Sequence, residues 1–126
     1  NSSILKIIKL AAENGFKLAI TTDHGMVYVK KPSQVVGDRE TSTNIRYKTG
    51  KSLTYDEKDV WAITNPEKLF LPKGNLSSKY IFAKNNIFLA YPKNYNHFVN
   101  YYKDTYQHGG ISLEEIIIPI SILEPK

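Results

Sequence analysis

The chain has 126 residues, which suits one compact domain with a core of its own and is short for two. Hydrophobic residues make up 41% and charged residues 23%, a balance that excludes an intrinsically disordered chain. Cysteine is absent, which excludes disulfide and thiolate chemistry. The net charge of +5 favours phosphate-bearing ligands, but it equally fits a lysine-rich surface that serves solubility.

The sequence has no apolar run of the about 18 residues that a membrane-spanning helix needs. Its first residues also lack the basic start, apolar centre and cleavage site of a signal peptide. We therefore expect a cytoplasmic protein without a membrane partner.

The first predicted element is a helix from about residue 4 to 13, because Ile4, Ile7 and Ala11 recur at helical spacing. Gly15 ends it in the left-handed conformation, and residues 16–21 read as a buried strand. Helix, glycine turn and strand are the second half of a β-α-β unit. Its first strand would lie before residue 1, so we expect the chain to be part of a longer domain.

The remaining elements follow from shorter patterns. We predict strands at residues 26–29, 61–63, 80–83, 87–90 and 116–123, a short edge strand at 45–47, and helical turns at 65–69, 95–103 and 112–115. Residues 80–83 and 87–90 flank an Asn-rich turn and predict a hairpin. The last strand is apolar on both faces, which favours a central position in a sheet. Ser112 and Glu115 have the spacing of a capping box.

Asp23 and His24 come directly after the first predicted strand and are followed by Gly25. In open α/β sheets, ligands bind beyond the carboxyl ends of strands, where this pair would lie. Zinc accepts carboxylate oxygen and imidazole nitrogen, so the pair is a candidate metal site. The alternative is that Asp23 caps a turn and His24 lies on the surface.

His108 is the other candidate ligand, in the loop just before the last predicted strand. That position again places a ligand-type side chain at a sheet edge, although a loop histidine taken alone is usually solvated. His97 falls inside the predicted helix at 95–103, and we interpret it as a structural or surface residue.

The polar segment at residues 37–42 is the third candidate. Arg39 could form a bidentate contact with a phosphate, and the Thr41 hydroxyl could donate to the same group. A solvated loop in which Arg39 pairs with Asp38 or Glu40 explains the pattern equally well.

Two of these motifs, in this order, resemble a known family. Thr21-Thr22-Asp23-His24-Gly25-Met26 is similar to the aspartate-histidine motif of the alkaline phosphatase superfamily. Gln107-His108-Gly109-Gly110 resembles that superfamily's last metal-binding histidine, in the His-Gly-Gly form of PglZ domains. Residues 36–44 are similar to PglZ-containing response regulators of the PorX type in Bacteroidetes. The resemblance covers nearly the whole chain, and the two motifs together are far more specific than either one.

The resemblance implies two zinc ions that hold a phosphoryl group between them. It assigns Asp23 and His24 to one ion and His108 to the other, and we add Arg39 and Thr41 as substrate-binding residues. The family's nucleophile, a Thr or Ser near the start of the domain, has no counterpart in this chain. We therefore expect no catalytic residue here, no phosphodiesterase activity from the chain alone, and weak or partial zinc binding.

The resemblance implies an α/β, alkaline-phosphatase-like fold. Residues 1–29 and 105–126 would belong to the core, and about residues 30–104 would form a small irregular α+β cap-like insertion. The expected function is that of the C-terminal part of a zinc-dependent phosphodiesterase or phosphatase domain in a two-component signalling protein.

The expected partners are a phosphate ester or nucleotide-type substrate and a histidine kinase. Exposed sheet edges would also favour homo-oligomers. Two alternatives remain open. One is a non-catalytic output or protein-binding module of a response regulator. The other is a basic nucleic-acid binder without a metal, whose affinity would fall with salt.

Overall fold

The computed structural model describes residues 2–72 and 78–125. In chain order its elements are α1 (Ser3–Glu13), β1 (Leu18–Thr21), β2 (Val27–Val29), β3 (Lys31–Gln34), β4 (Tyr47–Gly50), β5 (Val60–Ile63), the 3₁₀ helix η1 (Pro66–Leu69), β6 (Lys79–Ala83), β7 (Ile87–Ala90), α2 (Tyr95–Tyr102), β8 (Thr105–Gln107), α3 (Leu113–Ile116) and β9 (Ile120–Leu123). The mixture of helices and strands agrees with the α/β class. None of the helices in these two ranges is long and apolar enough to cross a membrane.

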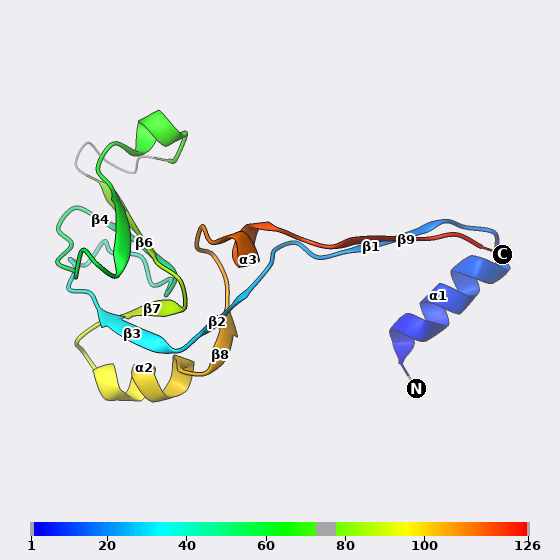
Figure 1. Cartoon of the computed structure of the whole chain (residues 1–126), viewed down its shortest axis with the longest axis horizontal. Helices are drawn as coiled ribbons and strands as arrows, with labels where there is room; N and C mark the ends of the chain where they lie inside the picture. The colour runs from blue at the N-terminus through cyan, green and yellow to red at the C-terminus, as the bar shows by residue number, and fades with distance from the viewer. Residues whose placement is uncertain (1, 73–77, 126) are drawn as a thin grey trace.

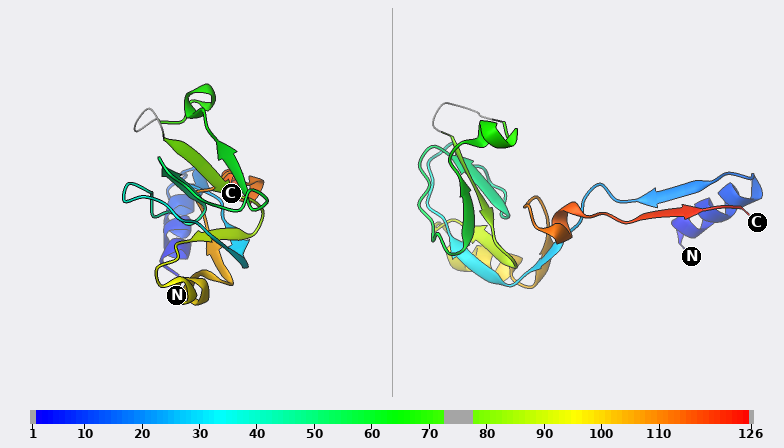
Figure 2. Two further views of the ribbon diagram at one scale, coloured as in Figure 1. Left: turned by 90° about the vertical axis from the view of Figure 1, so that its left-hand side faces the viewer. Right: turned by 45° about the horizontal axis from the view of Figure 1, so that its top comes forward.

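The elements from β2 to β8 gather into one body, from which β1 and β9 extend as a long antiparallel ribbon (Figure 1). Helix α1 lies at the far end of this ribbon, and both ends of the chain lie beside it (Figures 1 and 2). Within the body, β4, β6 and β5 form an antiparallel sheet, β3 pairs with β7 in parallel, and β2 pairs with β8. The division of the chain into a core and a cap-like insertion stays a prediction.

The core of the body lies on both sides of β7. Ile87 and Leu89 belong to an apolar cluster with residues from β5 and β6, whereas Phe88 and Ala90 pack with residues from β2. Helix α2 covers the second cluster (Figure 1). All four residues of β7 are apolar because neither of its faces meets water.

Several local predictions are confirmed. Helix α1, helix α2 and the capping box at the start of α3 lie where the sequence placed them. Gly15 has a φ of 72°, as expected for a left-handed helix end. Asn85 has a φ of 46° in the turn between β6 and β7, which asparagine tolerates better than most residues.

The predicted hairpin of β6 and β7 is wrong. The turn forms, and the Ile87 amide donates to the Lys84 carbonyl at 3.0 Å, but the two strands enter different sheets. Strand β6 pairs with β4 and β5, while β7 pairs with β3. No strand was predicted at β3, because Pro32 is typical of a strand break. Proline is compatible with an edge strand that has a single neighbour.

The predicted edge strand at residues 45–47 lies two residues too early, because β4 begins at Tyr47. The Asn44 side-chain oxygen accepts the Arg46 amide at 2.8 Å and the Tyr47 amide at 3.3 Å. This local turn takes up amides that a strand ladder would otherwise use, and so delays the start of the strand.

The predicted burial of the first and last strands is also wrong for the described residues. Strand β1 has three exposed residues of four, and β9 is exposed throughout. Each pairs only with the other among the described elements, so β9 is not central. The large apolar side chains exposed on α1, β9 and the segment around α3 are Ile4, Leu5, Ile7, Leu10, Ile111, Leu113, Ile116, Ile117, Ile118, Ile120, Ile122 and Leu123.

Candidate metal centre

The two candidate histidines lie face to face. The ring centroids of His24 and His108 are 3.7 Å apart, and the ring planes are 13° from parallel. The pairing of β2 with β8 brings them together, because Val27 is opposite Gln107. The chain just before β2 and the chain just after β8 therefore emerge side by side.

Asp23 lies at the outer side of this pair. Its side chain is 88% exposed, and its Oδ1 is 3.7 Å from His24 Nε2. His24 Nδ1 donates to the Gly25 carbonyl oxygen at 2.8 Å, which leaves the lone pair on Nε2. The two groups that could bind a metal at this motif, the Asp23 carboxylate and His24 Nε2, thus face the same space.

Gly25 is required by close packing against the α3 segment. Its amide donates to the Glu115 carbonyl at 3.0 Å. A Cβ at this position would lie 2.1 Å from the Glu114 carbonyl oxygen and 2.9 Å from that of Ile117. Only glycine lets the two segments approach this closely.

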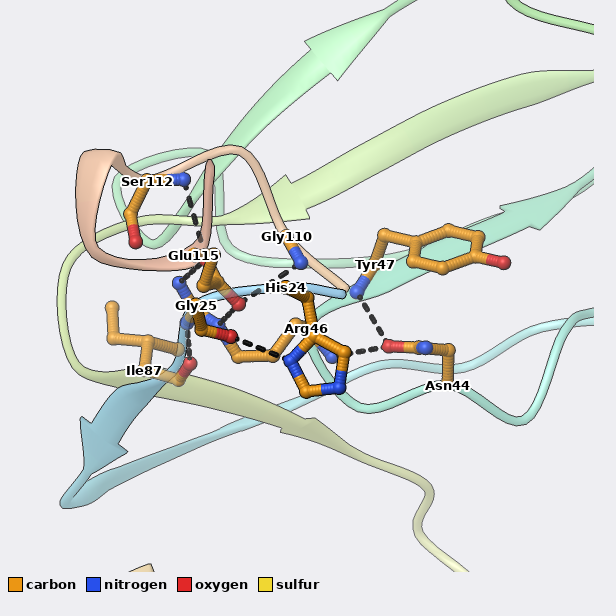
Figure 3. A network of polar contacts seen from close by, with 9 residues as sticks. All are labelled: His24, Gly25, Asn44, Arg46, Tyr47, Ile87, Gly110, Ser112 and Glu115. Atoms are coloured by element: carbon orange, nitrogen blue, oxygen red, sulfur yellow. Dashed lines mark hydrogen bonds and ion pairs between the residues drawn. The ribbon is translucent and has the colours of Figure 1, made fainter. Parts of the chain in front are cut away.

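A buried ion pair between Arg46 and Glu115 lies close to His24 (Figure 3). Arg46 Nε is 2.8 Å from Glu115 Oε1, and Arg46 Nη2 is 2.9 Å from Oε2. The two side chains are 0% and 1% exposed. Burial raises the pKa of Glu115, but the hydrogen bonds and charge of Arg46 outweigh it, with help from the Gly110 amide, so the pKa lies below its usual value.

Sequence reasoning missed Arg46. Glu115 was expected only as a capping-box residue, and nothing near Arg46 in the sequence marks it as buried. Its partner lies 69 residues further along the chain, so only the fold reveals the pair.

The loop that carries Arg39 and Thr41 is organised by Asp38. The Asp38 carboxylate accepts hydrogen bonds from the amides of residues 40, 51 and 52 and from the Thr41 hydroxyl, at 3.0–3.2 Å. These bonds, that of the Ser52 amide foremost, hold its pKa below the usual value. Arg39 is exposed. In the described parts of the chain, no hydrogen bond or ion pair joins Arg39 or Thr41 to either histidine.

A second buried cation lies on β4. Lys48 Nζ donates to the Asn44 carbonyl at 2.7 Å and to the Ser42 carbonyl at 3.3 Å, and it lies 4.1 Å from the centroid of the Tyr91 ring. Burial lowers the pKa of Lys48 to about 8. His97, in contrast, lies exposed on α2, where its ring stacks with that of Tyr101, in agreement with a surface role.

The donor atoms at the histidine pair suit zinc, which binds imidazole nitrogen and carboxylate oxygen. Within residues 2–72 and 78–125, however, no group of three or more His, Cys, Asp or Glu side chains is arranged to hold one ion. The described residues therefore fit a partial ligand set rather than a complete one.

The family model of the BREX system PglZ alkaline phosphatase-like domain matches residues 2–122. No curated protein matches the chain.

Proposed function

Because the chain belongs to the family of PglZ alkaline phosphatase-like domains, a hydrolase-type domain, we propose that it supplies three ligands of a two-zinc site. Asp23 and His24 would bind one ion, and His108 would bind the other. The site would hydrolyse a phosphate ester or a nucleotide-type substrate.

The stacking of His24 on His108 is the observation that supports this proposal most. Two-metal sites hold their ions about 3.5–4 Å apart. The ring centroids are 3.7 Å apart and the rings are nearly parallel, so two ions bound to nitrogens on the same side of the stack would have a comparable separation. When bound, zinc would stabilise negative charge on the phosphoryl oxygens.

The chain's own residues would hold and orient this centre. The Gly25 carbonyl fixes the tautomer in which His24 Nε2 can bind a metal. The negative charge of Asp23 would offset part of the positive charge of the two zinc ions. Arg39 and Thr41 would contact the substrate phosphate. The Thr41 hydroxyl donates to the Asp38 carboxylate at 3.2 Å, which helps to hold the loop that carries both residues.

The nucleophile would come from another part of the same domain. In this proposal, residues 1–29 and 105–126 belong to the hydrolase core, and about residues 30–104 form a cap-like insertion. The exposed apolar side chains of α1 and β9 support a larger domain, since they leave an apolar surface without a covering layer in the described chain. The resemblance of residues 36–44 supports a cytoplasmic two-component response regulator with a histidine kinase as partner.

Hydrolysis of a chromogenic phosphodiester by the polypeptide that carries the complete domain tests the proposal. We expect turnover that a chelator removes and zinc restores, and loss of that turnover in His108→Ala. His97→Ala is the matched control and should keep wild-type turnover. Wild-type turnover and zinc content in His108→Ala would refute the proposal. A wild-type protein with neither zinc nor turnover would favour the non-catalytic output module instead.

A further inference from the structure

We propose that Arg46 is a positioning residue for this centre. Its buried ion pair with Glu115 holds the loop that carries His108 and the turn that carries His24, and so sets the face-to-face arrangement of the two rings. The inference rests on the proposed function for the role of zinc, but the arrangement of the rings can be measured without any metal.

The guanidinium group of Arg46 is fixed to the body. Arg46 Nη1 donates to the Ile87 carbonyl on β7, and the Arg46 backbone carbonyl accepts the Ala83 amide at 2.8 Å. The Asn44 side chain also accepts the Arg46 backbone amide, so these contacts leave Arg46 little freedom to move. The guanidinium therefore presents its other N–H groups from a rigid position.

Glu115 connects this rigid position to the His108 loop. Oε1 accepts Arg46 Nε and the Gly110 amide, the latter at 2.9 Å. Oε2 accepts Arg46 Nη2 and the Ser112 amide, the latter at 3.2 Å. Each oxygen thus ties the guanidinium to one loop amide (Figure 3). Gly110 is only two residues beyond His108 in the sequence.

The backbone of Glu115 connects the same position to His24. Its carbonyl accepts the Gly25 amide at 3.0 Å, and the Gly25 carbonyl accepts His24 Nδ1 at 2.8 Å. The two histidine segments therefore share one support, the Glu115 residue, which Arg46 holds in place.

Positioning can be separated from stability at such a pair. Replacing both members of a buried ion pair by apolar residues of similar volume often leaves stability unchanged, whereas removing one member leaves a buried charge without a partner. The double variant Arg46→Met/Glu115→Leu should therefore fold. It leaves the Gly110 and Ser112 amides without their acceptor, so the His108 loop should lose its defined position.

The test uses ¹H–¹³C correlation spectra of the histidine rings in the metal-free 126-residue chain, at a pH above the ordinary histidine pKa of about 6.5. In the wild type, mutual ring currents should displace the His24 and His108 ring protons upfield of their unfolded positions. In the double variant we expect most of that displacement to be lost, with the His97 signals unchanged. Lys48→Met is the matched control, since it removes a buried cation two residues from Arg46 without touching Glu115, and it should keep the displacement.

A folded double variant that keeps the wild-type displacement would overturn the inference. Should the double variant not fold, Glu115→Gln decides, because its NH₂ group cannot accept the two hydrogen bonds of one carboxylate oxygen. Reduced displacement in that variant supports the inference, and wild-type displacement overturns it. Zinc titration of the same samples is read separately. Absence of zinc binding in the wild type would count against the proposed function, while the ring signals would still decide the role of the Arg46–Glu115 pair.

Discussion

Lys48 should make the stability of the fold depend on pH in the alkaline range. Its Nζ lies among two carbonyl oxygens and the Tyr91 ring, and burial lowers its pKa from 10.5 to about 8. A shift of that size corresponds to about 3 kcal/mol. Below pH 8 the lysine is charged in both the folded and the unfolded chain, and the folded state carries the full cost of burying the charge.

Between about pH 8 and 10.5, the folded chain releases this proton while the unfolded chain keeps it. The free energy of unfolding should therefore rise with pH through this window, by up to about 3 kcal/mol for this group. Lys48→Met has no such group. Its stability relative to the wild type should be highest near pH 7 and should decline steadily towards pH 10.

Denaturant unfolding of both proteins at several pH values between 7 and 10 measures this difference. The effect of tyrosine ionisation on stability is common to both proteins and largely cancels in the difference. Burial also raises the pKa of Tyr91, which lies beside the lysine. Lys51→Met is the control, because the hydrogen bond that Lys51 donates to the Glu40 carboxylate raises the pKa of that exposed lysine and moves its titration away from the window. A stability difference between the wild type and Lys48→Met that stays constant from pH 7 to 10 would show that Lys48 keeps its ordinary pKa in the folded chain.

Two further predictions concern the supports of the candidate site and of the Asp38 loop. Gly15→Ala should destabilise the fold by about 1 kcal/mol, because only the left-handed φ opposes the new Cβ there. Gly25→Ala should cost several times as much, because its Cβ would meet backbone oxygens of the α3 segment. Equal melting temperatures for the two variants would contradict this prediction. Asp38→Asn should lower the melting temperature near neutral pH. A carboxyl group whose pKa is lowered by folding stabilises the fold at pH values above its unfolded-state pKa of 3.8. The difference in melting temperature from the wild type should therefore close as the pH falls below 3.8. A gap that is unchanged down to pH 2 would show that the loop does not depend on the Asp38 charge.

Local patterns determined the elements that the sequence predicted well. Helical spacing defines α1 and α2, and Gly15 and Asn85 adopt the backbone conformations that their residue types favour. The failures involve contacts between distant segments. The strand pairing of β7 depends on β3, more than fifty residues earlier, and a turn sequence carries no information about which sheet a strand enters.

The candidate site shows the same division. Asp23, His24 and His108 belong to short motifs that can be read directly from the sequence. The stacking of the two rings follows from the pairing of β2 with β8, and the support by Arg46 follows from a buried contact with Glu115, neither of which leaves a local pattern. Sequence could therefore identify the chemistry of the centre, but not the residues that hold it in place.

Whether the stacked histidines bind metal can be read from ¹⁵N spectra of the imidazole rings during a zinc titration. We predict that the Nε2 signal of His24 and a ring nitrogen of His108 shift on zinc addition and return on chelation, while His97 on α2 stays unchanged. Signals of His24 and His108 that do not respond to zinc, or that respond no more than those of His97, would contradict the account.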